Sequence, residues 1–419
     1  MISRGRTFVF VAMLPMFDPL CPAVALSGTL TGALVAGFDS YSEKYTLTQT
    51  KTLDRLNEFR TRINLGYLQG TLLDDYSQIE AQSLIGQESL EASGRLNLTR
   101  RFGNSRMALD NMITFRSYRE NSNYAFANDF RRYGLRVYAQ HDPVRDLTLR
   151  VADRLDVVDY EERTQFDYDY VQNVIEVGAS LDRGLASSYN ATIGLAHKSI
   201  PDTTEISYRA YNLGLEYRHI SGVRKQIFLT VSGERRMYAH KPARSPFWSF
   251  YSNANIQPFT VGIFGLTIDN SLESYLYDRE TNVFFDYVEN RSSAQISYFR
   301  STTFSVALGP TYGFLASGFS RTDEYKEIGG KLSVDYNTGG RVWLLASYEP
   351  GWRDYRIDDN DANLIFSDFS YHRILVFTNV RLWRNTSMNL FVNLEPEDHK
   401  ARDDDSTTTL FSSDISYSF

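Results

Sequence analysis

Cysteine is almost absent from this sequence, and so are long hydrophobic runs. The one cysteine, Cys21, lies within the first 25 residues, a segment that we expect to be removed. A mature chain without thiols excludes a disulfide scaffold and cysteine-ligated zinc, and it suits an oxidising compartment. The mean hydropathy of −0.36 leaves no second segment apolar enough for a membrane helix. The net charge of −7 gives no indication of nucleic-acid binding.

The N-terminus has the features of a secretory signal peptide. Arg4 and Arg6 precede an apolar stretch from Thr7 to Phe17, and the small residues Ala23-Val24-Ala25 follow. An uncleaved anchor helix is the alternative, but the apolar stretch is too short to cross a bilayer. We therefore predict a signal peptide over residues 1–25.

Residues 26–419 have a uniform residue pattern and are predicted to form one domain, because no linker or low-complexity tract divides them. That pattern is an alternation of apolar and polar residues. Leu147, Leu149 and Val151 share one face of a predicted strand, and Asp153 on the same face suggests a bulge. Similar runs recur, separated alternately by tight turns and by longer polar loops. This pattern predicts an up-and-down antiparallel meander.

A meander this long would leave unpaired strand edges unless it closed on itself. Closure into a barrel lets the polar faces point inward and the apolar faces meet lipid. We therefore predict an all-β fold, a transmembrane up-and-down antiparallel β-barrel of about 18 strands. Roughly 16 to 20 strands remain compatible with the sequence, because the chain before Phe102 is hard to partition.

Aromatic residues make up 14% of the chain. Transmembrane barrels carry girdles of aromatic side chains at the two membrane interfaces. We expect such positions for the aromatic residues near predicted strand ends, which are Phe102, Tyr118, Tyr160, Tyr170, Trp248, Tyr251, Trp352, Tyr355 and Trp383.

The chain ends in a regular alternation that places Ile415, Tyr417 and Phe419 on one face. With the signal peptide and the amphipathic strands, this ending resembles Gram-negative outer-membrane β-barrel proteins. The resemblance implies that these three residues act as an assembly signal read by the barrel-insertion machinery. It also implies that the protein lies in the outer membrane of a Gram-negative bacterium, surrounded by outer-membrane lipid.

A barrel of this size is expected to enclose an aqueous lumen. Rows of opposite charge on its wall would favour hydrophilic solutes. Alternatively, these charges only solvate the wet interior and neutralise one another. The residues predicted to line the pore are Asp110, Arg116, Arg136, Tyr138, Arg150, Arg154, Asp156, Glu176, Tyr208, Glu234, Arg236, Asp335 and Glu349.

The segment from Thr71 to Glu91 departs from the alternation. Leu72, Tyr76 and Ile79 are at helical spacing. One hypothesis is that this segment folds inward and narrows the pore, and the alternative is a longer strand pair with an outer loop.

We predict neither an enzyme nor a metal or cofactor site. The six histidines fit no lipase or protease motif that we can match. The acidic run at Asp358, Asp359 and Asp361 lacks the glycine of a calcium loop, since Leu364 stands there. Alternation begins by Thr29, so we expect no plug domain of the kind found in energy-coupled receptors.

The predicted function is an outer-membrane channel for hydrophilic solutes or for a polymer, with exopolysaccharide export as the favoured specific case. Such an exporter would have a periplasmic secretion partner. The alternative is a structural sheath that holds a partner protein in its lumen without an open pore.

Overall fold

The structure is a computed structural model. It describes residues 28–47, 50–70, 75–87, 89–118, 128–162, 167–184, 186–221, 225–238, 244–281, 284–318, 324–356, 367–400 and 405–419. The predicted signal peptide and the domain boundary at residue 26 lie outside these residues and stay predictions. Among the described residues, no helix is long and apolar enough to span a membrane.

Nearly all of the described chain is β-strand, as the alternation predicted. Apart from the short 3-10 helix η1 (Thr204–Ile206), the elements are β1 (Gly28–Leu47), β2 (Thr50–Gly70), β3 (Tyr76–Gly86), β4 (Ser89–Phe102), β5 (Ser105–Tyr118), β6 (Phe130–Val144), β7 (Leu147–Tyr160), β8 (Tyr170–Arg183), β9 (Ser187–Ser199), β10 (Tyr208–Ile220), β11 (Gln226–Tyr238), β12 (Phe247–Gln257), β13 (Thr260–Val261), β14 (Phe264–Tyr277), β15 (Tyr287–Phe299), β16 (Phe304–Ser317), β17 (Tyr325–Asn337), β18 (Val342–Tyr355), β19 (Phe369–Trp383), β20 (Thr386–His399) and β21 (Ser406–Ser418).

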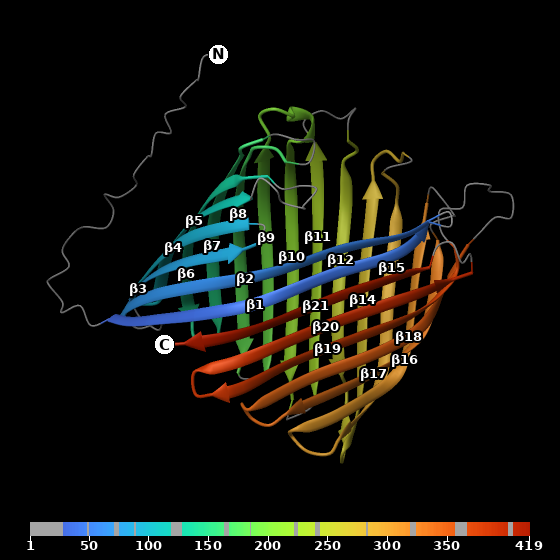
Figure 1. Ribbon diagram of the computed structural model, residues 1–419. Coiled ribbons are helices and arrows are strands. Elements are labelled where there is room, and N and C mark those ends of the chain that lie inside the picture. The colour runs from blue at the N-terminus through green and yellow to red at the C-terminus, as the bar shows by residue number, and fades with distance from the viewer. Residues whose placement is uncertain are drawn as a thin grey trace.

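The strands form one closed antiparallel barrel (Figure 1). Each strand pairs with the next along the chain, and β1 pairs with β21 to complete the ring. The two-residue β13 pairs only with β14, in the connection that follows β12, so the ring contains 20 strands. The predicted transmembrane up-and-down barrel is confirmed, at the upper end of the predicted strand number.

The two ends of the barrel differ in the length of their connections. At the end that holds Gly28 and Phe419, which we call the turn end, residues 103–104, 145–146 and 384–385 suffice to reverse the chain. At the opposite end, which we call the loop end, the connections include residues 119–129 and 356–368. The alternation of tight turns and longer loops therefore follows the pattern expected from the sequence.

The hypothesis of an inward-folded helical segment after Thr71 is wrong for the part that the structure describes. Residues 76–86 form β3, which pairs with β2 from Gly70↔Tyr76 to Arg60↔Gly86, and β4 begins at Ser89. The helical spacing arose because it was counted across the β2–β3 connection. Residues 71–74 lie outside the described residues.

The bulge suggested at Asp153 is also absent. Asp153 pairs with Val137 on β6 and with Ile175 on β8, inside an unbroken register. The Asp153 carboxylate instead accepts a hydrogen bond of 2.6 Å from Asn173 Nδ2 on the neighbouring strand. A side-chain partner, not a backbone irregularity, accommodates the polar residue on this face.

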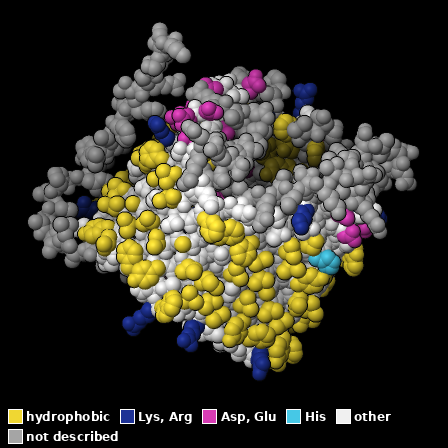
Figure 2. All heavy atoms as spheres, viewed as in Figure 1, with side chains coloured by type: hydrophobic (Ala, Val, Ile, Leu, Met, Phe, Trp, Pro, Cys, Tyr) yellow, Lys and Arg dark blue, Asp and Glu magenta, His cyan; other side chains and the backbone are white. Residues whose placement is uncertain are grey.

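The two faces of the wall have opposite character. Large apolar side chains such as Val177, Ile193 and Leu213 are on the outer face and remain exposed, and Figure 2 shows hydrophobic side chains spread over the outside of the barrel. Alternate residues on the same strands point inward and are mostly polar. An apolar outer face on a closed barrel supports the predicted location in the outer membrane of a Gram-negative bacterium.

The expected aromatic girdle holds for only part of the set. Because residues paired across strands share a face, the register assigns each of these nine aromatic residues to one side. Phe102, Trp248, Trp352 and Trp383 lie on the outer face. The residues that instead point inward are Tyr118, Tyr160, Tyr170, Tyr251 and Tyr355. A position at a strand end does not itself select the lipid side, because the period of two decides the face.

Candidate functional site

All thirteen residues predicted to line the pore lie on the inward face. In the strand register, Asp110 is opposite Arg136, and Arg136 is opposite Arg154. Residues opposite each other share a face, so the inward assignment extends from strand to strand. The same register places on this face Arg116, Tyr138, Arg150, Asp156, Glu176, Tyr208, Glu234, Arg236, Asp335 and Glu349. Their part in solute passage stays a prediction.

Many of these inward charges pair along the wall. Arg154 Nε lies 2.6 Å from Asp156 Oδ2, and Arg132 Nη2 lies 3.1 Å from the other oxygen of the same carboxylate. Arg236 Nη2 lies 2.6 Å from Glu234 Oε1. Opposite charges on the same or adjacent strands thus neutralise one another, which favours local solvation of the wet interior over a field across the lumen.

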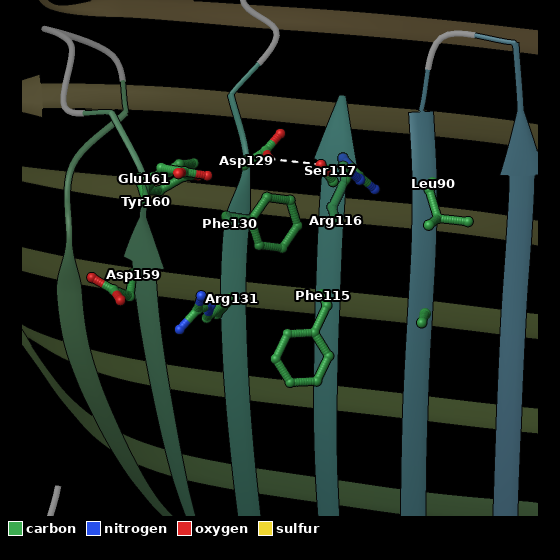
Figure 3. A pocket seen from close by; sticks show the side chains of 11 residues that line it. Leu90, Phe115, Arg116, Ser117, Asp129, Phe130, Arg131, Asp159, Tyr160 and Glu161 are labelled. Atoms are coloured by element: carbon green, nitrogen blue, oxygen red, sulfur yellow. Dashed lines mark hydrogen bonds between the residues drawn. The ribbon is translucent and has the colours of Figure 1, made fainter. Parts of the chain in front are cut away.

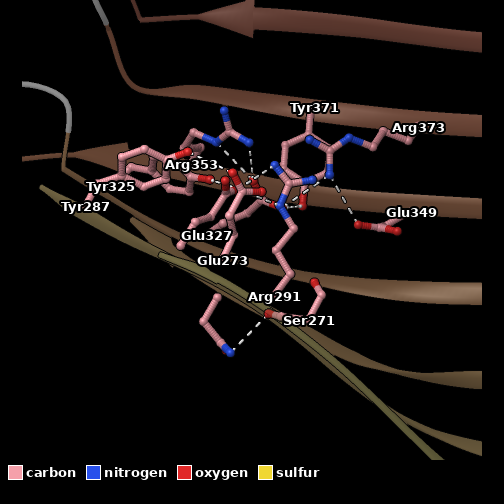
Figure 4. Close-up of polar contacts among 12 residues, drawn as sticks. Ser271, Glu273, Tyr287, Arg291, Tyr325, Glu327, Glu349, Arg353, Tyr371 and Arg373 are labelled. Carbon is pink, nitrogen blue, oxygen red and sulfur yellow. Dashed lines mark hydrogen bonds and ion pairs between the residues drawn. The ribbon is translucent and has the colours of Figure 1, made fainter. Parts of the chain in front are cut away.

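The densest polar cluster surrounds Glu327 on β17, near the loop end (Figure 4). Glu327 is only 5% exposed. Its Oε2 accepts hydrogen bonds from Arg353 Nε at 2.9 Å and Nη2 at 2.6 Å. Its Oε1 accepts from Tyr371 Oη at 2.9 Å and from Arg373 Nη1 at 3.2 Å. A buried carboxylate is stable here because two guanidinium groups and a hydroxyl satisfy it.

Arg373 extends the cluster across β18 and β20. Arg373 Nε donates to Glu395 Oε1 at 2.5 Å, and Nη1 lies 3.3 Å from Glu349 Oε1. The Arg373 guanidinium also lies 4.2 Å from the centre of the Tyr371 ring, which is fully buried. Gly351 makes this packing possible, since a Cβ at that position would overlap the Tyr371 ring and hydroxyl.

The polar contacts continue from this cluster towards β14. Tyr325 Oη donates to Glu289 Oε1 at 2.7 Å, and Glu289 pairs with Arg291 at 2.9 Å. Tyr287 Oη donates to Glu273 Oε1 at 2.8 Å. Side chains from six strands, which are β14, β15 and β17 to β20, therefore form a polar lining on this part of the inner wall (Figure 4).

Sequence reasoning found only Glu349 in this lining and missed Glu327, Arg353 and Arg373. A usable signal was present, because Glu349, Gly351, Arg353 and Tyr355 alternate along one strand face. The pairing between strands, however, is a property of the register.

Inward aromatic side chains form a second feature, at the loop end of the wall, which we call the aromatic collar. Phe130 and Tyr160 have ring centres 5.8 Å apart, and Tyr325 and Tyr355 also lie 5.8 Å apart. The collar occupies the inward position at the loop end of most strands from β5 to β19, with β9 and β16 not contributing, and consists of Tyr118, Phe130, Tyr160, Tyr170, Tyr208, Tyr238, Phe247, Tyr277, Tyr287, Tyr325, Tyr355 and Phe369.

Aspartates at the bases of the loops link neighbouring strands at the loop end. The backbone N–H of the residue that ends one strand donates to an aspartate just before the next strand. The pairs are Tyr118 with Asp129 at 2.6 Å, Tyr160 with Asp169 at 2.9 Å, Tyr277 with Asp286 at 2.6 Å, Tyr355 with Asp368 at 2.8 Å and His399 with Asp405 at 2.8 Å. Sequence analysis missed this repeat, although an aspartate precedes an aromatic residue at four of these strand starts.

A shallow pocket of about 530 Å³ lies at the loop end of β4 to β7 (Figure 3). Its lining includes Leu90, Phe115, Arg131 and Asp159. The register places these four side chains on the outer face, where Arg131 and Asp159 are opposite each other on β6 and β7. The pocket therefore belongs mainly to the outer surface and not to the predicted pore.

One histidine has contacts that resemble a catalytic arrangement. Ser367 Oγ lies 2.8 Å from His399 Nδ1, and His399 Nε2 lies 3.4 Å from Glu397 Oε2. The second contact is longer than the roughly 2.6–3.2 Å reach of an orienting hydrogen bond. Glu397 also accepts a hydrogen bond from Ser406, and His399 packs on Phe369. We interpret the group as packing at the base of a loop.

Metal binding has no support in the described part of the chain, where no group of three or more His, Cys, Asp or Glu side chains is placed to hold an ion. The acidic run at residues 358–361, considered above for calcium, lies outside the described residues.

The C-terminal residues expected to act in assembly all lie at the turn end. Ile415, Tyr417 and Phe419 are 49%, 48% and 57% exposed. Phe419 N donates to Gly32 O at 2.9 Å, and Gly32 N donates to Phe419 O at 3.0 Å, so the last residue continues the closing β1–β21 pair. Their recognition by the insertion machinery stays a prediction.

No protein-family model matches the chain, and no curated protein matches it in sequence. Solved structures match its fold. The copper transporter OprC is 10% identical with a TM-score of 0.59, covering 94% of this chain and 80% of that one. A BenF-like porin from Pseudomonas fluorescens Pf-5 is 11% identical with a TM-score of 0.52, covering 93% and 99%.

The siderophore receptor PirA from Pseudomonas aeruginosa is also similar, at 11% identity and a TM-score of 0.51, covering 93% of this chain and 80% of that chain. At identities this low, the structural match establishes a common fold and nothing further. The chain thus has the fold of outer-membrane β-barrels.

Proposed function

We propose that this protein is an outer-membrane channel that passes hydrophilic solutes through a mixed-charge lumen. The observation that carries the proposal is a closed ring of 20 strands whose inner face is polar and ion-paired. Barrels of about 16 to 18 strands already leave an aqueous channel, whereas eight-stranded barrels fill with side chains. The ring found here exceeds the size that side chains of the wall fill.

Export of an exopolysaccharide is the specific case that we favour. Outer-membrane barrels place their short turns in the periplasm and their longer loops outside the cell. A polymer leaving the cell would therefore enter at the turn end and pass the aromatic collar last. A periplasmic secretion partner would dock at the turn end. The alternative remains a sheath that holds a partner protein in the lumen.

Single-channel conductance of the refolded mature protein in a planar bilayer tests the proposal. We expect discrete steps whose ion preference changes in Arg150→Ala and Glu234→Ala, since both side chains lie on the inward face. A matched control is Arg209→Ala, because Arg209 lies on the outer face of β10. Silence from a folded, heat-modifiable barrel would contradict an open channel and support the sheath.

A further inference from the structure

An apolar patch interrupts the polar inner wall near the turn end of β18 to β20. Trp343 and Leu345 point inward and are 43% and 37% exposed. Leu345 pairs with Phe377, which in turn pairs with Phe391, so one row of the inner wall is apolar over three strands. Trp248, Trp352 and Trp383 all lie on the outer face, which leaves Trp343 as the one inward tryptophan.

The adjacent row is made of amides and a carboxylate. Trp343 pairs with Asn379, Asn379 with Asn389, and Asn389 with Asp414. Asn379 Nδ2 donates to Asn389 Oδ1 at 2.6 Å, and Asn389 Nδ2 donates to Asp414 Oδ1 at 2.9 Å. These bonds orient the three polar groups and use only part of their donor and acceptor capacity.

The Trp343 ring is held in a defined orientation. Its centre lies 5.1 Å from that of Phe377, at an interplanar angle of 73°. This edge-to-face contact fixes the indole, while its 43% exposure leaves part of the side chain accessible from the lumen. A fixed aromatic surface beside oriented amides is therefore available to a passing solute.

This combination suits a carbohydrate. One face of a pyranose ring presents C–H groups that are weakly positive, and an aromatic face is negative. The hydroxyl groups at the ring edge both donate and accept hydrogen bonds, which amides and carboxylates complement. A purely apolar ligand would gain nothing from the Asn379–Asn389–Asp414 row, and an anionic ligand would be repelled by the Asp414 carboxylate and by the negative face of the Trp343 ring.

We propose that Trp343 and Phe377, with Asn379, Asn389 and Asp414, form a binding site for an uncharged sugar chain on the inner wall, which we call the sugar site. The inference rests on the proposed channel function, which it deepens by naming the class of substrate. Its position near the turn end is where an exported polymer would first meet the wall.

The first test is block of the single-channel current by maltohexaose, a neutral glucose hexamer. We expect transient blocks in the wild type and a binding constant about tenfold weaker in Trp343→Ala, the loss of ~1.4 kcal/mol. Trp352→Ala is the matched control, because Trp352 lies on the same strand but faces outward. Normal conductance without sugar block, or equal weakening in both variants, would overturn the inference and leave the channel function standing.

A second test does not need an open pore. In a variant with Trp248, Trp352 and Trp383 replaced by phenylalanine, all of the remaining tryptophan fluorescence comes from Trp343, and it is followed with excitation selective for tryptophan over tyrosine. Maltohexaose should shift or quench this emission, and Asn389→Leu should weaken the effect. A change in emission in a barrel that conducts no ions would reject the channel but support the sugar site. An unchanged emission would reject the sugar site.

Discussion

On β18, Trp343 points into the barrel and Trp352 points out of it, and the same contrast runs around the whole wall. Outward rings such as Phe115 and Trp352 are 49% and 63% exposed on the surface that faces lipid. Inward rings of the collar are packed, with Phe247 at 6% and Phe369 at 6% exposure. The outer rings are stabilised by a solvent, the bilayer, whereas the inner rings depend on specific neighbours.

Arginines account for much of that difference. Arg236 lies 4.4 Å from the Tyr208 ring centre, and Arg353 lies 4.2 Å from that of Tyr325. A guanidinium over an aromatic face gains both packing and electrostatic attraction. Inner-face substitutions should therefore affect stability through lost partners, and outer-face substitutions should affect it mainly through lost apolar area.

The largest effect is expected where the inner wall holds a buried charge. Glu327→Gln keeps the size of the side chain but leaves Arg353 and Arg373 without their shared carboxylate. We expect the free energy of unfolding to fall by about 3–5 kcal/mol. Urea unfolding of the barrel in lipid vesicles measures it. A wild-type midpoint would show that the cluster contributes little to stability.

A smaller effect is expected from the space needed by Tyr371. Gly351→Ala places a methyl group against the Tyr371 ring, and we expect a loss of about 1–3 kcal/mol from overpacking. Gly94→Ala is the control, because a Cβ at Gly94 meets nothing within 4 Å. The same unfolding assay applies. Equal stability of the two variants would mean that the ring moves aside freely.

The smallest effects are expected when one aromatic ring on each face is replaced. Phe130→Leu removes a ring that lies 5.8 Å from Tyr160 and 5.0 Å from Arg116, and we expect a loss of about 1–2 kcal/mol. Phe115→Leu, on the outer face of the adjacent strand, should change stability by less than about 0.5 kcal/mol. Thermal shifts of the two variants in the same vesicles give the ranking. A reversed ranking would break the comparison between faces.

Much of the fold could be predicted because apolar and polar residues alternate with a period of two along each strand. Leu149 and Arg150 were assigned to opposite faces from the alternation alone, and the register agrees. The number of strands was less accessible, because the region before Phe102 contains the two longest strands, β1 and β2, and few turn residues.

The candidate site was predictable only in part. Arg154 and Asp156 were found because they alternate on one strand. The cluster around Glu327 was missed because its partners come from β18 and β19, and no local pattern states which residues will be opposite each other. The inward direction of Tyr118 and Tyr160 was missed because residue type was allowed to outweigh position in the alternation.

The sequence by itself determined the strand character, the face of each side chain and the need for closure, because these follow from a two-residue period and from unpaired strand edges. Tertiary structure alone decided the ring of 20 strands, the pairing of β1 with β21, and the meeting of Glu327 with Arg353 and Arg373. Those depend on register, because a shift by one residue would turn every side chain to the other face.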